Sequence, residues 1–327
     1  MKIRILGAAA GGGVPQWNCR CGNCEAARAT PSAGSLLVRP RTQSSVAVSA
    51  DERTWFLLNA SPDIRQQVLA FPPLGPPPGN ARGQSIAGCI LTDAELDHTA
   101  GLLLLREGGP FAILSTALVR RWLNQYLPLE ALLASFANPA WVDLPLDRQM
   151  LLTGGGADGP AIVELQADRK TGPRQYGLLL RAFAVDPHLP RFVTEKDAPS
   201  VGSVIGLVVE DVRTKGKLVY APCVGALSEP LLRAAQDADL ILLDGTFWSD
   251  EEPVRFGIGG RTALQMGHLP VSGRHGSLAW LADLPVRQRV YIHINNTNPM
   301  LNERGPEFHE VTSRGVRVGA DGDSFGL

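Results

Sequence analysis

Three short apolar runs each lead into an acidic or histidine side chain. The runs and their polar groups are 86–92 with Asp97 and His98, 239–246 with Asp244, and 289–296 with His293. Apolar runs of this length are typical of buried strands. Because a strand is rigid and the loop beyond it is free to carry function, polar groups at strand ends are well placed to build a site. We therefore expect these side chains to form one metal-binding site, rather than four unrelated surface or turn residues.

The stretch LTDAELDHTAGL (91–102) has the outline of a metal-binding turn, in which Asp97 is directly followed by His98. A related pattern, His-x-His-x-Asp-His, supplies ligands for two metal ions. Asp93 and Glu95 stand where its first two histidines would be. The second half of the pattern is kept and the first half is changed, which predicts one intact metal position and one impaired position.

The remaining pattern indicates an α/β fold. Strands are expected over 2–6, 44–50, 54–60, 86–92, a hairpin within 203–222, 239–246, 289–296 and 315–322, and helices over 100–108, 117–127 and 230–238. The Pro- and Gly-rich stretch 71–80 is expected to form a surface loop, and the pattern over 145–200 assigns no elements. Strands that come early and late, with helices after each group, favour two packed sheets with helices outside, within one domain over 1–327.

Three of the five cysteines, Cys19, Cys21 and Cys24, lie within six residues of one another. An odd number of cysteines, crowded this closely, fits disulfide geometry poorly and favours a reducing, cytoplasmic setting. Thiolates are soft ligands suited to zinc, so the loop at 17–25 predicts a structural zinc site that takes a fourth ligand from elsewhere. The separate Cys89 and Cys223 are expected to be packing residues.

Composition excludes several classes of function. The formal net charge is −1 and no Lys/Arg block occurs, so we expect no nucleic-acid partner. No run of 18 or more apolar residues occurs, so we expect no membrane span. Lys2 and Arg4 interrupt the apolar residues at the start, where a signal peptide would need an unbroken apolar segment.

The remaining histidines divide into two groups. His268 lies in RTALQMGHL, a helix-like segment whose end could turn into the site. A functional role and an ordinary structural role are equally open for it. His188, His275 and His309 are expected to be solvated loop or helix histidines.

The chain resembles the bacterial pyrroloquinoline quinone (PQQ) biosynthesis protein B family. The resemblance runs end to end, through GAAAGGGVPQWNCRCGNC, RTQSS, NASPDIRQQ, DHTAGLLLLREG, LLDGT, RTALQMGHL and HINNTNP. That family belongs to the metallo-β-lactamase superfamily, which implies an αββα sandwich of two mixed sheets flanked by helices.

The resemblance also implies the ligands. Asp97, His98 and His293 would hold the active-site metal, and Asp244 would lie at the superfamily's bridging carboxylate. Asn296 takes the place of a histidine that relatives with a similar cysteine loop use for zinc, so it is the candidate fourth ligand of that site.

Two histidines and one carboxylate with open positions are the ligand pattern of mononuclear non-heme Fe(II) oxygenases. The resemblance therefore implies hydroxylation of the tyrosine ring of a cross-linked Glu–Tyr precursor during PQQ biosynthesis. His268, Asp244 and Asp93 are the candidate catalytic residues, and Arg65 is a candidate for binding substrate carboxylates, although an ion pair of Arg65 with Asp63 explains it equally well.

Two alternatives stay open at this point. One is a non-catalytic carrier that moves PQQ or its precursor towards the periplasm. The other is a zinc hydrolase in which Asp93 and Glu95 stand in for the missing histidines. Contacts with other PQQ biosynthesis proteins and a homodimer are compatible with the sequence.

Overall fold

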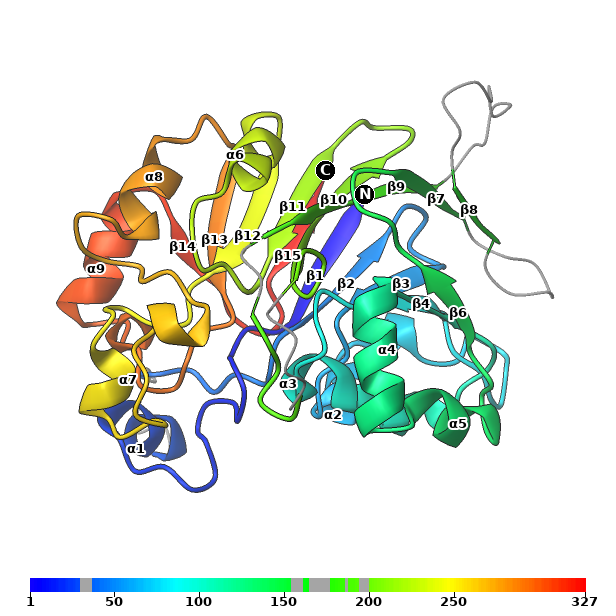
Figure 1. Ribbon diagram of the computed structural model, residues 1–327, viewed down its shortest axis with the longest axis horizontal. Helices are drawn as coiled ribbons and strands as arrows, with labels where there is room; N and C mark the ends of the chain where they lie inside the picture. Colours follow the sequence, from blue (N-terminus) through cyan, green and yellow to red (C-terminus); the bar gives the residue numbers. More distant parts are fainter. Residues whose placement is uncertain (30–36, 154–160, 165–176, 186–187, 194–199) are drawn as a thin grey trace.

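The computed structural model describes residues 1–29, 37–153, 161–164, 177–185, 188–193 and 200–327. In these ranges two β-sheets lie face to face with helices on both outer sides (Figure 1). The seven-stranded sheet has the order β15-β1-β2-β3-β4-β5-β6, and the eight-stranded sheet has the order β14-β13-β12-β11-β10-β9-β7-β8. The predicted αββα sandwich is confirmed.

The strands of the first sheet are β1 (Lys2–Gly7), β2 (Ser45–Ser49), β3 (Trp55–Leu58), β4 (Ile86–Ile90), β5 (Ala112–Ser115), β6 (Ala140–Asp143) and β15 (Ser324–Gly326). The strands of the second sheet are β7 (Gln149–Thr153), β8 (Ala161–Glu164), β9 (Leu178–Ala184), β10 (Ile205–Asp211), β11 (Lys217–Ala221), β12 (Leu240–Asp244), β13 (Gln288–Ile292) and β14 (Arg317–Val318). The α-helices are α1 (Gly22–Arg28), α2 (Ile64–Ala70), α3 (Leu96–Thr99), α4 (Ala117–Tyr126), α5 (Leu129–Ala134), α6 (Glu229–Gln236), α7 (Glu252–Arg255), α8 (Ser277–Asp283) and α9 (Pro306–Ser313).

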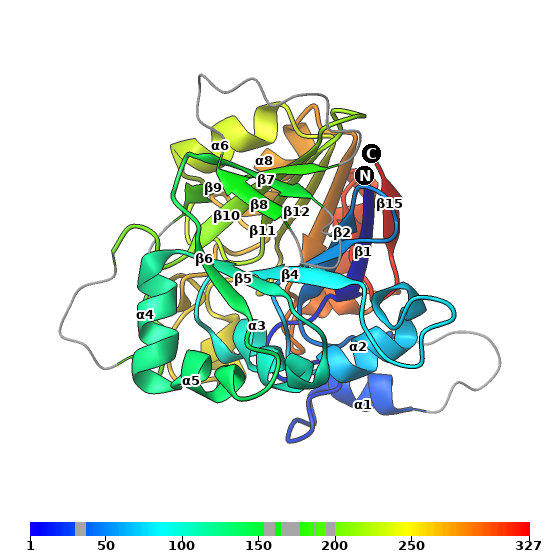
Figure 2. The same cartoon turned by 90° about the vertical axis from the view of Figure 1, so that its right-hand side faces the viewer.

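Alternate residues of each strand explain why the strands read as continuous apolar runs. In β12, Leu240 and Leu242 point into the core between the sheets, whereas Ile241 and Leu243 point into a second core beneath α6, α8 and α9. On the other side, a third core packs the first sheet against α2, α4 and α5. Figure 2 shows α6 and α8 on one side of the two sheets and α2, α4 and α5 on the other. Strands buried on both faces carry no polar alternation.

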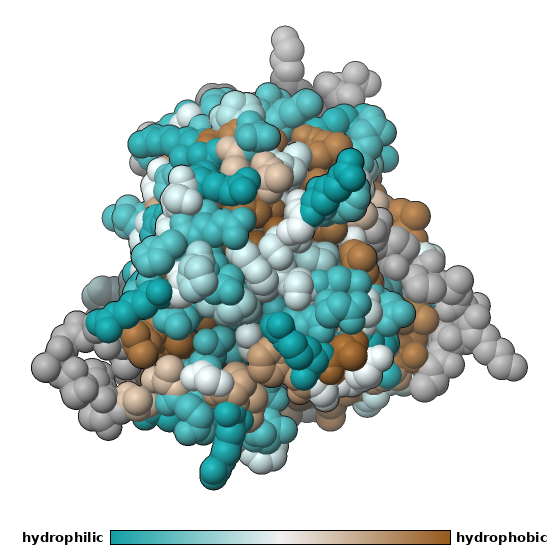
Figure 3. Space-filling view, turned by 90° about the vertical axis from the view of Figure 1, so that its left-hand side faces the viewer, coloured by the Kyte–Doolittle hydropathy of each residue, from teal (hydrophilic) through white to brown (hydrophobic). Residues whose placement is uncertain are grey.

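The outer surface is polar where the helices meet solvent. Figure 3 shows the face over α7, α8 and α9, where hydrophilic residues cover most of the surface and hydrophobic residues lie between them. Among the described residues, none of the helices has both the length and the apolar character needed to cross a membrane.

The two chain ends lie side by side because β1 pairs antiparallel with β15 (Figure 1). The amino group of Met1 forms a buried ion pair with Asp211 at 2.8 Å and donates a hydrogen bond to the carbonyl of Leu327. This contact attaches the end of the chain to β10 of the second sheet and joins the two layers.

Three elements differ from the sequence-based expectations. The expected buried helix over 100–108 is a 3₁₀-helix (Ala100–Glu107) in which Leu103 and Leu104 are exposed. The helix-like segment before His268 contains only the short 3₁₀-helix Leu264–Met266, which ends at Gly267 with a left-handed φ of 84°. The described parts of 145–200, which the sequence left unassigned, contain β7, β8 and β9.

The 3₁₀-helix after α3 lies directly against the end of β3. The amide of Gly101 donates to the carbonyl of Ala60, and the amide of Ala60 donates to the carbonyl of His98. A Cβ atom at Gly101 would lie 2.2 Å from the carbonyl oxygen of Ser61 and 2.7 Å from that of Ala60. Only a glycine allows this close approach, which sets the position of the Asp97–His98 turn.

Replacing this glycine should therefore destabilise the fold. Gly101→Ala is expected to lower the free energy of unfolding by about 1–3 kcal/mol, because the backbone must move to admit the methyl group. Gly109→Ala is the matched control, since no atom lies within 4 Å of its added Cβ. Urea unfolding of both variants checks this expectation, and equal stabilities would contradict it.

Candidate metal centre

Four strand ends meet at one edge of the sandwich. β11, β12 and β13 run parallel to one another, so their carboxyl ends lie together, and the end of β4 faces them from the other sheet. The turn with Asp97 and His98 follows β4, and the short loop with Cys223 follows β11. Asp244 is the last residue of β12, and His293 comes directly after β13. The structure thus brings the strand-end side chains that the sequence predicts as ligands to one edge. Among the described residues, possible ligand atoms lie within 4.8 Å of one another in two groups here: His98, Cys223 and His293, and Asp244, His268 and His293.

His98 is oriented by Asp93. Both carboxylate oxygens of Asp93 lie 2.8–2.9 Å from Nδ1 of His98, and both side chains are buried. Asp93 also accepts hydrogen bonds from the hydroxyl of Thr92 and the amide of Glu95. The ring therefore directs Nε2 towards the site, where this buried nitrogen has no hydrogen-bond partner among the described residues.

Asp244 orients the two other histidines. Its Oδ2 accepts from Nδ1 of His268 at 2.7 Å and from the amide of Val224 at 2.8 Å. Its Oδ1 accepts from the amide of Thr246 at 2.9 Å and from the hydroxyl of Thr246 at 2.6 Å. The hydroxyl oxygen of Thr246 in turn lies 2.8 Å from Nδ1 of His293. Of the roles open to Asp244, the structure shows hydrogen bonding to the histidines, directly or through Thr246.

Asp97 faces the free nitrogen of His293. The distance from Asp97 Oδ2 to His293 Nε2 is 3.2 Å. If the hydroxyl of Thr246 donates to Asp244 and its oxygen accepts from Nδ1–H of His293, the Nε2 lone pair faces the carboxylate. Two ligand atoms about 2.1 Å from one metal ion, at right angles to each other, are about 3.0 Å apart. A cation between Asp97 and His293 would satisfy both groups.

The charges and the burial of the site shift the pKa values of its side chains in opposite directions. Burial alone would lower the pKa of His98, but the charges of Asp93 and Asp97 outweigh it and raise this pKa to about 9. Burial, together with the proximity of His98, lowers the pKa of His293 and keeps that ring neutral. Burial, followed by the charges of Asp93 and Asp97, raises the pKa of Glu95 to about 7.

A cavity of about 1340 Å³ opens in front of these groups. Asp97, His98, His268 and His293 line its base. Three guanidinium groups, from Arg20, Arg191 and Arg261, also line it, together with the apolar side chains of Phe247, Phe256 and Leu264. This combination suits a ligand that has an aromatic part and several negative charges.

The cysteine loop forms one wall of the same cavity. The Sγ atoms of Cys19, Cys21 and Cys24 all lie within 4.8 Å of one another, and Cys19 and Cys21 line the cavity. Nδ2 of Asn296 lies 3.3 Å from Sγ of Cys24 and 3.7 Å from that of Cys21, so the amide occupies the fourth side of the thiol group. The nitrogen and oxygen of such an amide exchange places on rotation, which would turn Oδ1 towards the thiols.

Sequence reasoning missed three residues of the site. His188, expected to be solvated, lines the cavity with its ring centroid 6.5 Å from that of His268, and burial lowers its pKa to about 4. Thr246 gave no signal, since a threonine after a strand is ordinary. Cys223 is buried, as expected of a packing residue, but it also lines the cavity.

The other expected residues lie away from the centre. His275 and His309 are exposed, as predicted, and Cys89 is packed in the core beneath α2 and α4. Arg65, the candidate for binding substrate carboxylates, is exposed on α2 and is not among the residues that line the cavity.

Comparisons with known proteins agree with this geometry. The family model of the beta-lactamase superfamily domain matches residues 54–294. Coenzyme PQQ synthesis protein B of Pseudomonas fluorescens (strain SBW25) is 44% identical over 329 residues, and that of Ectopseudomonas mendocina (strain ymp) is 41% identical over 327 residues. In both cases 100% of each chain is covered. The chain belongs to the coenzyme PQQ synthesis protein B family.

Solved structures extend the comparison. Zn(2+)-bound PqqB from Methylobacterium extorquens matches with a TM-score of 0.83 at 36% identity, and 100% of each chain is covered. A diphosphatase from the PhnP family matches with a TM-score of 0.62 at 15% identity, covering 100% of this chain and 97% of that one. The second likeness shows the fold alone. The resemblance read from the sequence is therefore confirmed at the level of family and fold.

Metal affinity should rise with pH. Because the pKa of His98 is about 9 in the metal-free protein, a divalent ion must displace a proton from its ring at neutral pH. Displacing the proton of His98 is expected to contribute about a tenfold increase in affinity per pH unit from about pH 7 to about pH 9. Competition titrations against a chelator of known pH dependence measure this slope. Asp93→Asn should flatten it by lowering the pKa of His98, and an equal slope in both proteins would contradict the expectation.

Proposed function

We propose that this chain hydroxylates the tyrosine ring of a cross-linked Glu–Tyr precursor in PQQ biosynthesis, using Fe(II) held by Asp97, His98 and His293. The observation that carries the proposal is the close approach of Asp97 Oδ2 to Nε2 of His293, 3.2 Å apart, beside the unpartnered Nε2 of His98. Two imidazoles and one carboxylate, with positions left open, suit a mononuclear non-heme iron.

The cavity suits the proposed substrate. The precursor carries several carboxylates and one phenol ring. Arg20, Arg191 and Arg261 would bind the carboxylates, and Phe247 and Phe256 would contact the ring. The phenol would then lie against the base of the cavity, close to Asp97 and the histidines.

His268 would hold the phenol. Its Nδ1 donates to Asp244, so its Nε2 is the nitrogen available to a ligand, and the charge of Asp244 outweighs burial to raise its pKa. The ring can therefore donate a hydrogen bond to the phenol oxygen and take up or return its proton. Bound iron would supply the activation of O₂. One oxygen atom enters a ring C–H bond as hydroxyl, the other leaves as water, and an external two-electron reductant supplies the electrons.

The cysteine loop would hold a structural zinc ion. Cys19, Cys21 and Cys24 supply three thiolates, and Asn296 supplies the fourth ligand through its amide oxygen. Because the same loop forms a wall of the cavity, zinc at this position would fix the substrate-binding surface as well as the fold.

The hydrolase alternative requires Asp93 to act as a metal ligand. Both oxygens of Asp93 are instead occupied by His98, Thr92 and the amide of Glu95. A carboxylate used in this way strengthens the basicity of a metal-bound histidine and orients its ring. This favours a single metal position over the pair that hydrolysis of esters or phosphodiesters uses in this fold.

Reconstitution with Fe(II) or Zn(II) under anaerobic conditions tests the function. After addition of the cross-linked substrate, ascorbate and O₂, only the iron form is expected to add oxygen to the ring and consume O₂. Asp97→Ala should lose this turnover and keep substrate binding. If neither metal form changes the substrate but both bind it or finished PQQ, the carrier alternative replaces the proposal. Ester or phosphodiester turnover in the zinc form alone would support the hydrolase.

His268→Gln tests the role assigned to that ring. The substitution is expected to lower kcat about 100-fold, with a small change in KM, because proton transfer is lost while the carboxylate contacts remain. It should also remove the limb of the pH–rate profile that reports His268. His275→Gln is the matched control on the surface, and a similar loss in both variants would contradict the assignment.

A further inference from the structure

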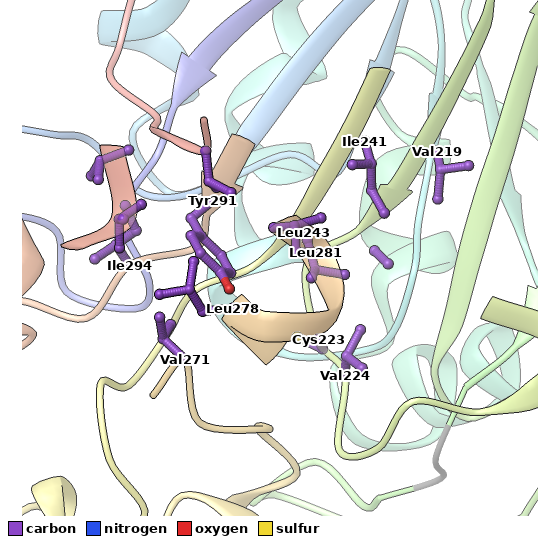
Figure 4. Packing of buried hydrophobic residues seen from close by; sticks show 14 of the residues in the cluster. Val219, Cys223, Val224, Ile241, Leu243, Val271, Leu278, Leu281, Tyr291 and Ile294 are labelled. Atoms are coloured by element: carbon purple, nitrogen blue, oxygen red, sulfur yellow. The ribbon is translucent and has the colours of Figure 1, made fainter. Parts of the chain in front are cut away.

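Cys223 lies on the short loop after β11, at the edge of the core beneath α6 and α8. Its side chain is 3% exposed, and its neighbour Val224 packs in the same core (Figure 4). A buried cysteine of this kind is ordinarily a small apolar residue. Its position at the base of the cavity distinguishes it, because the core ends there and the histidines begin.

The thiol forms a group with two of the histidines of the metal centre. One ligand atom from each of His98, Cys223 and His293 lies within 4.8 Å of the others, and all three residues are buried. A thiolate about 2.3 Å and an imidazole about 2.1 Å from one ion are at most about 4.4 Å apart, so small side-chain shifts bring the group into bonding distance. Independently, His98 is completely buried, and its Nε2 has no partner among the described residues.

From this arrangement we infer that Cys223 is a fourth ligand of the active-site metal, bound as a thiolate alongside Asp97, His98 and His293. The inference rests on the metal site of the proposed function but not on hydroxylation. When the sulfur–metal bond forms, the thiol proton passes to solvent. A six-coordinate ion would still keep open positions, and a soft sulfur ligand would shift the preference of the site towards Zn(II) and Co(II) and away from Mn(II) and Mg(II).

The backbone holds the thiol in place for this role. The amide of Val224, the residue after Cys223, donates to Oδ2 of Asp244 at 2.8 Å. The same carboxylate orients His268 and, through Thr246, His293. The buried carboxylate of Asp244 therefore positions the loop with Cys223 and two of the imidazoles together, as a preorganised ligand set requires.

Cobalt spectroscopy of the full-length protein tests the inference without measuring turnover. Wild-type protein, Cys223→Ser and Cys223→Ala are stripped of metal and titrated with Co(II) anaerobically, and thiolate-to-cobalt absorption and the dissociation constants are recorded. Cys89→Ser is the matched control, because Cys89 is also completely buried but lies in the core beneath α2 and α4. Thiolates of the Cys19–Cys21–Cys24 loop contribute equally in all four proteins.

In the two Cys223 variants, the thiolate-to-cobalt absorption should be weaker by the contribution of one thiolate. They should also bind Co(II) at the active site about tenfold more weakly or worse, while Mn(II) affinity changes less. Cys89→Ser should match the wild type. Two replacements are used so that poor folding of one, seen as a lowered melting temperature without metal, leaves the other as the test.

His98→Ala separates the two ways in which the inference can fail. If the Cys223 variants keep the wild-type absorption and affinity while His98→Ala loses active-site cobalt, the metal site stands and the thiolate ligand is overturned. If His98→Ala also matches the wild type, the metal site of the proposed function is overturned together with the ligand.

Discussion

The buried carboxylate of Asp244 is the contact on which the arrangement of the site depends. It accepts four hydrogen bonds, from the amides of Val224 and Thr246, the hydroxyl of Thr246 and the ring of His268. Val224 follows β11, Thr246 follows β12, and His268 follows the 3₁₀-helix Leu264–Met266. Thr246 extends the network to His293 at the end of β13. A buried carboxylate that lost these donors would be strongly destabilising, so the chain must hold all of these loops in one arrangement.

The end of β13 then links the active site to the cysteine loop. His293 has a φ of 54°, a left-handed conformation that is unfavourable for a histidine and turns the chain sharply as the strand ends. Three residues later, Asn296 contacts Cys21 and Cys24 through its side chain. The hydroxyl oxygen of Thr246, 2.8 Å from Nδ1 of His293, helps to hold the ring in this conformation. The four residues 293–296 therefore connect the histidine of the active site directly to the cysteine loop.

The sequence predicted the layers and the meeting of most of the strand-end polar side chains, because both depend on short-range pattern. Apolar runs such as LILLD identify strands buried on both faces, and an Asp or His that ends such a run can be recognised from the sequence alone. The pattern could not show that Asp93 lies behind His98, since a carboxylate five residues earlier can equally well bind a metal. Nor could it identify His188, Thr246 or Cys223 as neighbours of the centre, because their positions follow from tertiary packing between distant segments.

The balance of charge explains why such a site would take a cation. Four carboxylates, from Asp93, Glu95, Asp97 and Asp244, surround three imidazoles at the base of the cavity. The pKa values of Asp93 and Asp244 are lowered because adjacent histidines outweigh the effect of burial, so both acids stay ionised.

In the metal-free protein, protons on His98 and His268 offset part of this negative charge, and their pKa values are raised accordingly. Burial lowers the pKa of His293, and its Nε2 lies 3.2 Å from the carboxylate of Asp97. A divalent ion placed between them supplies the missing positive charge at the point where the protein provides none. In the proposed site, the proton on His98 would occupy the place that the metal takes, and Asp93 in place of the first histidine of the two-metal pattern would leave a single position.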